Sequence, residues 1–208
     1  MNDSTEKQAR IDNFNERREV LLKEGYNETA QTISILKANL MAFVTAGPLA
    51  LLCGVAYIVR WRHYFVGGSF NFRSLLIGYL FFMLLLVVSI FIHEGLHGLV
   101  WGLFCKEKYK SIHIGMNWRM LTPYCHCKEP LCFSSYILGG LAPLIVLGFG
   151  TFAASMFIRS SLLIFLSAMN ILCAGGDTTV ACMLLKYRKK DAVIIDHPTD
   201  CGFYAYTK

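Results

Sequence analysis

The chain has 208 residues, of which 55% are hydrophobic and 16% are charged, and its net charge is +6. A soluble domain is typically about 25% charged, so this composition excludes an ordinary soluble globular protein. Anionic headgroups on the cytoplasmic face of a membrane account for the basic balance. We therefore expect the lipid bilayer as a partner and no nucleic-acid binding.

The first segment, residues 1–37, is polar and contains six Lys or Arg and seven Asp or Glu residues. It has no short apolar core of the kind that marks a signal peptide, so we expect a retained, mainly helical cytoplasmic segment. Gly25 and Tyr26 are expected to break this helix, and Asn27 is expected to cap the next one.

Four apolar runs follow, and only Glu94 and Asp177 interrupt them with a charge. A helix needs about 20 apolar residues to cross a bilayer, so each run is long enough to span. We predict an all-α, polytopic membrane protein with about four transmembrane helices. The four runs cover residues 38–59, 74–105, 130–158 and 160–185.

Two local patterns refine this prediction. Gly47-Pro48 predicts a kink in the first span, because proline cannot donate a backbone hydrogen bond. Residues 111–115 alternate between polar and apolar side chains, which predicts a short strand. Its expected partner in a hairpin is the stretch 118–124.

The positions of Lys and Arg predict the orientation. Sixteen of the 20 lie in segments 1–37, 106–128 and 186–208, and the other four lie at 60–73 and 159. Positive residues favour the cytoplasmic side, so both termini are expected there. We expect a multi-pass protein of the bacterial inner membrane. Its expected parts are a cytoplasmic segment (1–37), a membrane domain (38–186) and a cytoplasmic tail (187–208).

The second run contains His93-Glu94-Gly95-Leu96-His97. His93 and His97 are four residues apart and therefore share one face of a helix. Ionisable side chains are costly in a membrane and usually have a function there. In the pattern His-Glu-x-x-His, the two histidines bind Zn²⁺ and the glutamate acts as general base. We predict a zinc metallopeptidase with a membrane-embedded site in which Glu94 is the catalytic residue.

Catalytic zinc usually has three protein ligands and one open position. Asp177 is the only other acid within the apolar runs, so we predict it as the third ligand beside His93 and His97. Asp177 hydrogen-bonded to Thr178 or Thr179 in a helix contact is the alternative. A second alternative is that the residues of the whole motif bind no metal and only bridge helices through hydrogen bonds.

Three further residues are secondary candidates. Asn170 lies seven residues before Asp177, on nearly the same helix face two turns away. It is a candidate for binding the oxyanion or the substrate backbone, or for a hydrogen bond between helices. His126 and Glu129 are candidates for a ligand or substrate contact in the loop after the second run.

The same loop allows two other interpretations. A second metal site could use Cys125, His126, Cys127 and Cys132, although Cys-x-Cys matches the usual zinc-ligand spacing poorly. The interpretation we favour is a strand that receives substrate by backbone pairing.

Three other functions were weighed against a peptidase. Haem needs axial ligands from opposite faces of its ring, whereas His93 and His97 share one helix face. A transporter could use the same His, Glu and Asp as an ion path, but the sequence has no visible repeat. A non-catalytic metal-binding protein, acting as sensor or scaffold, is the runner-up. The sequence leaves open whether the protein forms a homodimer.

The motif, the segment 124–131, the stretch 174–177 and the tail 196–204 together resemble a family of bacterial membrane proteins known as putative zincin peptidases. The resemblance covers about residues 75–205 and implies a membrane zinc peptidase with an unidentified protein or peptide substrate. The chain is more distantly similar to the site-2 proteases, whose third ligand is an aspartate in an Asn-x-x-Pro…Asp-Gly pattern. Here Asn170 precedes Asp177, but that proline is absent and Thr178 replaces the glycine. This departure weakens the case for a site-2-protease-like role of Asn170 more than the case for Asp177 as a ligand.

Overall fold

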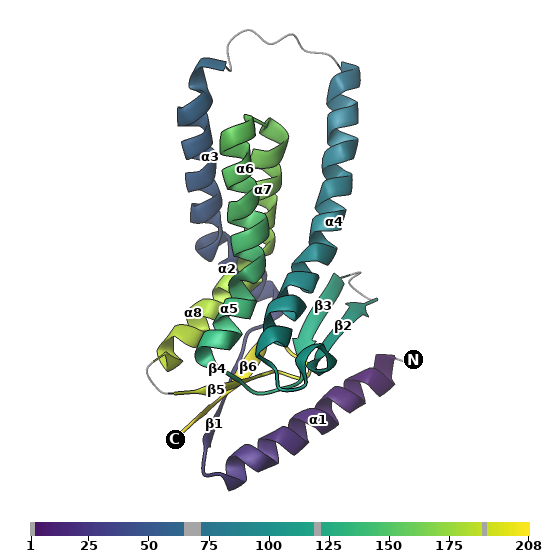
Figure 1. The fold of residues 1–208 in the computed structure, drawn as a ribbon, viewed down its shortest axis with the longest axis vertical. Helices are drawn as coiled ribbons and strands as arrows, with labels where there is room; N and C mark the ends of the chain where they lie inside the picture. The colour runs from purple at the N-terminus through teal and green to yellow at the C-terminus, as the bar shows by residue number, and fades with distance from the viewer. Residues whose placement is uncertain (1–2, 65–71, 119–121, 189–190) are drawn as a thin grey trace.

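The computed structural model of the chain describes residues 3–64, 72–118, 122–188 and 191–208. Its long helices run side by side, and two small antiparallel sheets and helix α1 lie at one end of them (Figure 1). Both described ends of the chain lie at this sheet end. The predicted helical class is therefore confirmed in its main part, but the prediction of an all-α chain missed the sheets.

The N-terminal segment folds differently from the prediction at Asn27. Gly25 has a φ of +83°, which suits a residue without a side chain and ends the first helix. Asn27 then begins a strand that pairs with the C-terminal tail, so it caps no helix. Ser34 is the cap, since its hydroxyl accepts a hydrogen bond from the Lys37 amide. The elements are α1 (Asp3–Lys23), β1 (Asn27–Thr32) and α2 (Ile35–Thr45).

Each predicted apolar run corresponds to a long helix or a bent helix pair. Three helices in the described residues are long and apolar enough to cross a membrane, and a fourth span follows if the pair α7 and α8, bent by 45°, counts as one. The first span breaks at Ala46, directly before Gly47-Pro48, as the sequence predicts. The elements are α3 (Gly47–Trp61), η1 (Arg62–Tyr64), α4 (Phe72–Phe104), α5 (Phe133–Pro143), the π-helical turn η3 (Leu144–Phe149), α6 (Gly150–Ile158), α7 (Ser161–Cys173), α8 (Gly175–Leu184) and η4 (Leu185–Tyr187).

Two antiparallel sheets complete the fold. A hairpin forms as predicted, but its second strand lies later than the expected stretch 118–124, of which 119–121 are outside the described residues. After the short turn η2 (Lys108–Ser111), strand β2 (Ile112–Asn117) pairs with β3 (Thr122–Cys127). The second sheet has the order β1-β6-β5-β4, which joins the N-terminal segment to the C-terminal tail. Its remaining strands are β4 (Leu131–Cys132), β5 (Val193–Asp196) and β6 (Gly202–Thr207).

A buried cluster locks the helices to this sheet. Trp101 of α4, Tyr136 of α5 and Leu184 of α8 pack with Ile194 and Phe203 of the sheet. By contrast, apolar side chains farther along α3 and α4 are largely exposed, such as Leu52, Leu80 and Leu84. The protein core therefore lies at the sheet end, and exposed apolar helix surface covers the rest, as is expected of a helix in lipid.

Helices α2 and α8 cross very closely at Gly175. A Cβ atom there would lie 2.1 Å from the Cβ and 2.7 Å from the Cα of Ala42, whereas one at Gly176 would have nothing within 4 Å. We expect Gly175→Ala to destabilise the protein by about 1–3 kcal/mol, the usual cost of overpacking. Gly176→Ala is the matched control and should leave stability unchanged. Thermal unfolding in detergent tests this, and equal melting temperatures for the two variants would contradict the close crossing.

Candidate metal centre

Helices α4 and α8 bring the three predicted ligands together. The ligand atoms of His93, His97 and Asp177 all lie within 4.8 Å of one another. The two imidazole Nε2 atoms are 3.2 Å apart. Asp177 Oδ2 lies 3.1 Å from His93 Nε2, and Asp177 Oδ1 lies 3.4 Å from His97 Nε2. A single ion could therefore contact all three side chains.

The bend between α7 and α8 places Asp177. Helix α7 ends at Cys173, and the next helix begins at Gly175, so Asp177 lies in the first turn of α8. The positive end of a helix dipole favours a carboxylate in that turn. Close contact of Gly175 with α2 fixes where α8 begins. The glycine at the start of α8 therefore lets the first turn of this helix place the Asp177 carboxylate next to α4.

A carbonyl group of α5 orients His97. The Nδ1 atom of His97 lies 2.9 Å from the backbone oxygen of Gly139. A carbonyl can only accept, so Nδ1 carries the proton and the Nε2 lone pair is left for a metal. In a regular helix the amide four residues later would donate to Gly139, but that residue is Pro143 and has no N–H. Pro143 therefore leaves this carbonyl available to His97.

Two aromatic rings support the same histidine. Trp101 stacks on His97 with ring centroids 5.1 Å apart, and Tyr136 stacks on Trp101 at 5.4 Å. The indole N–H of Trp101 donates to the backbone oxygen of Tyr136 at 3.0 Å. These contacts hold the plane of the His97 ring.

The arrangement fits a zinc ion. Asp177 Oδ2 is buried and makes no hydrogen bond of acceptable geometry with the described residues, although His93 Nε2 is near. Tetrahedral zinc with bonds of about 2.0–2.1 Å separates its ligand atoms by about 3.3 Å. The two imidazole nitrogens are 3.2 Å apart, and each lies 3.1 or 3.4 Å from one of the two Asp177 oxygens, which is close to that value. A cation would also satisfy the otherwise unpaired oxygen.

Glu94 lies outside the ligand group and faces the hairpin. It follows His93 directly, so its side chain is turned by about 100° from that ligand. Its carboxylate lies close to Cys125 in β3. Glu94 is therefore placed between the ligand face of α4 and strand β3, as a base beside a metal-bound site requires.

The outer edge of β3 has little free donor capacity. Lys128 donates to Ser111 on the β2 side, so the alternate residues Cys125 and Cys127 point their amides away from β2. The Cys127 amide donates to Asp196 at 2.8 Å, and the Cys125 residue lies close to Glu94. Pro123 has no amide hydrogen. A substrate that pairs with this edge, the arrangement expected from the sequence, would therefore meet the carboxylate of Glu94.

The secondary candidates lie outside the ligand group. Asn170 donates to the backbone oxygen of Leu147 at 3.5 Å, so it bonds to the π-helical turn in another span. Thr178 and Thr179 both donate to the Gly175 carbonyl, and neither bonds to Asp177 in the contacts described. Of the two roles considered for Asn170, the hydrogen bond between helices is thus the one that the structure contains.

His126 and Glu129 are buried, and both make contacts outside the ligand group. Burial lowers the pKa of His126, although Asp196 Oδ2, 3.6 Å from its Nδ1, favours the charged form. Burial alone would raise the pKa of Glu129, but hydrogen bonds from the Ser111 hydroxyl and the amides of Lys106 and Glu107 hold it below its ordinary value. Glu129 thereby fastens the end of β3 to the end of α4.

Only one group of three or more potential metal ligands occurs among the residues that the structure describes. The second metal site considered for the Cys125–Cys132 patch does not form there.

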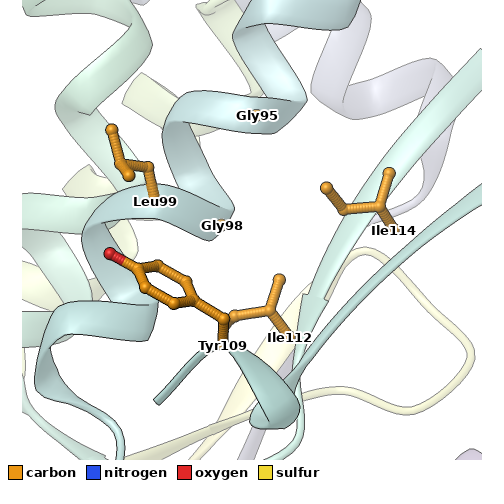
Figure 2. A pocket seen from close by; sticks show the side chains of 6 residues that line it. All are labelled: Gly95, Gly98, Leu99, Tyr109, Ile112 and Ile114. Atoms are coloured by element: carbon orange, nitrogen blue, oxygen red, sulfur yellow. The ribbon is translucent and has the colours of Figure 1, made fainter.

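A separate apolar pocket of about 410 Å³ lies between α4 and the hairpin (Figure 2). Gly95 and Leu99 follow His93 and His97 by two residues, so they are turned about 200° from them. The pocket is thus on the opposite side of α4 from the metal ligands. It is lined by Gly95, Gly98, Leu99, Tyr109, Ile112 and Ile114.

Comparison with known families agrees with the geometry. A family model described as "Putative zincin peptidase" matches residues 85–192, which is more than half of the chain. The chain belongs to this family. The zincin match includes His93, Glu94, His97 and Asp177, and the family's description implies zinc. No curated protein and no solved structure gives a significant match.

Sequence reasoning missed three supports of this zincin site: the Gly139 carbonyl, Trp101 and Asp196. Two of them left a signal in the sequence. Trp101 lies four residues after His97 and so shares its helix face. Gly139 lies four residues before Pro143, the spacing at which a proline frees a carbonyl. Asp196 lies beyond the apolar runs, and only the fold brings it near.

Gly139 offers a test of the support around His97. A Cβ atom at Gly139 would lie 2.1 Å from Cδ1 of Trp101, whereas one at Gly140 would have nothing within 4 Å. Gly139→Ala should displace the indole and weaken zinc binding by about 10–100-fold, the usual effect of losing a residue that orients a ligand. Gly140→Ala should bind zinc normally. Zinc titration of both purified variants measures this, and equal affinities would refute the supporting role of Trp101.

Proposed function

We propose that the protein is a membrane-embedded zinc metallopeptidase that hydrolyses peptide bonds in or near the membrane. The observation that carries this proposal is the meeting of two histidines and one aspartate from different helices, with Glu94 beside them. All four side chains lie within helices apolar enough to span a bilayer. Such groups are costly there without a partner, and a bound cation removes the cost.

His93, His97 and Asp177 would hold the ion. When bound, zinc supplies a Lewis acid that polarises the scissile carbonyl and makes water acidic near neutral pH. Glu94 takes the proton of the attacking water and later returns it to the leaving amine. Because Glu94 lies close to Cys125 of β3, the hairpin borders this base on the side where substrate would bind.

Exchanging the base and exchanging a ligand should give different results. Glu94→Gln keeps the shape of the side chain but cannot accept the proton, so hydrolysis should fall by about 10²–10⁴-fold with zinc content unchanged. Asp177→Ala removes a ligand, so zinc affinity should fall together with activity. Metal analysis and cleavage of a membrane-protein substrate pool by wild type and variants measure both effects.

The outcomes separate a peptidase from a metal-binding sensor or scaffold. Full activity of Glu94→Gln would refute the peptidase and leave only metal binding. Full zinc retention by Asp177→Ala would place the third ligand elsewhere. His93→Ala is the positive control for loss of zinc.

We further propose that both termini and the hairpin face the cytoplasm. The described parts of the segments that contain sixteen of the 20 Lys and Arg residues lie toward the sheet end of the molecule, whereas the ends of α3 and α6 lie at the opposite end (Figure 1). This division supports the orientation that the positive-inside rule favours.

Cysteine labelling in intact cells tests the orientation. A membrane-impermeant maleimide should label Arg62→Cys and Arg159→Cys, which lie at the outer end. Lys23→Cys and Lys208→Cys should react only after the membrane is permeabilised. Wild type provides the background from native cysteines. Labelling of Lys208→Cys in intact cells would invert the proposed topology.

A further inference from the structure

Asp196 is a buried carboxylate outside the family match, and none of the sequence predictions assigned it a role. It ends strand β5 and is 8% exposed. We propose that Asp196 is a positioning residue that holds both the strand beside Glu94 and the aromatic rings beside His97. This inference rests on the proposed peptidase function for its kinetic part.

The first contact of Asp196 reaches the base. Its Oδ2 atom accepts a hydrogen bond of 2.8 Å from the Cys127 amide. The next outward-facing residue along β3 is Cys125, which lies close to Glu94. Asp196 thus holds the strand edge that borders Glu94. Loss of the Asp196 bond frees one end of this edge and lets the neighbour of Glu94 shift.

The second contact reaches a metal ligand. The Tyr136 hydroxyl donates to Asp196 Oδ1. Tyr136 stacks on Trp101, which stacks on His97, and the Trp101 indole also donates to the Tyr136 backbone. Helix α5 carries Tyr136 together with Gly139, the acceptor for His97 Nδ1. Asp196 therefore fixes the start of the helix that orients His97.

The rigidity of its own strand makes Asp196 a suitable anchor. It pairs with Phe203 in the β5–β6 register, and the amide of His197 donates to Gly202 at 3.1 Å. The four-stranded sheet thus holds the carboxylate, and the carboxylate holds the hairpin and α5. Buried networks of this kind lose function when one member loses its acceptor, because the donor stays unsatisfied.

Asp196→Asn tests this role with little change in shape. An amide has one acceptor oxygen, so it can serve the Cys127 amide as before, but the Tyr136 hydroxyl loses its charged acceptor and can only accept from the new NH2 group. We expect kcat to fall by about 10–100-fold, as is usual when a supporting hydrogen bond is lost, with KM changed less than about twofold and one zinc retained. Tyr136→Phe breaks only the second contact and should give a smaller loss of kcat.

The matched control is Glu28→Gln in the same sheet. Glu28 also accepts from a tyrosine hydroxyl, that of Tyr206 at 2.8 Å, and it pairs with Arg18 at 2.6 Å. The Arg18 guanidinium holds the pKa of Glu28 below its ordinary value, so Glu28 is a stabilising carboxylate of the sheet. We expect Glu28→Gln to lower the melting temperature and leave kcat unchanged. A fall in kcat equal to that of Asp196→Asn would overturn the positioning role.

Two readouts do not depend on peptidase activity. The visible spectrum of the cobalt(II)-substituted protein reports the ligand geometry at His97, and it should shift in Asp196→Asn but not in Glu28→Gln. Alkylation of Cys127, which is fully buried, by N-ethylmaleimide should become about tenfold faster in Asp196→Asn. Wild-type spectrum and labelling rate in Asp196→Asn would overturn the inference. Shifts in both, with an inactive wild type, would support the positioning role and refute the peptidase.

Discussion

The metal centre depends on one hydrogen bond, from His97 Nδ1 to the Gly139 carbonyl at 2.9 Å. It exists because Pro143, one helical turn later, has no amide to occupy that carbonyl. The bond fixes the tautomer of His97 and points Nε2 toward His93 and Asp177. An interruption that would weaken an isolated helix is here the feature that orients a ligand, and the lost backbone bond is replaced by a side-chain bond from α4.

The third span contains further backbone carbonyls that accept hydrogen bonds from side chains of another helix. The π-helical turn after Pro143 exposes the carbonyls of Leu147 and Gly148, and side chains of α7 satisfy them. Asn170 donates to Leu147, and Ser167 donates to Gly148 at 2.8 Å. Polar residues inside the apolar helices thus serve two purposes in this protein. Some of them donate hydrogen bonds to backbone carbonyls that lack a partner within their own helix. A separate set of ionisable residues forms the candidate metal site.

The sheet end of the molecule supports this site from outside the spans. The N-terminal strand pairs with the C-terminal strand, and the resulting sheet holds Asp196 against both β3 and α5. Glu129 fastens the same end of the hairpin to α4 through backbone amides. Glu94, the proposed base, therefore lies beside a strand whose end two carboxylates anchor. Segments far apart in the chain contribute to one rigid frame around the proposed reaction.

The sequence alone predicted the apolar spans and the three candidate ligands that the fold brings together, because their signals are local or unique. Spacing of four residues puts His93 and His97 on one helix face, and Asp177 is the only other acid within the apolar runs besides Glu94. The hairpin was also readable from the alternation in 111–115. The four-stranded sheet, the strand at Asn27 and the place of Asp196 were decided by tertiary structure. Strand pairing between residues 27–32 and 202–207 joins the two ends of the chain, and no local pattern reports a partner so distant.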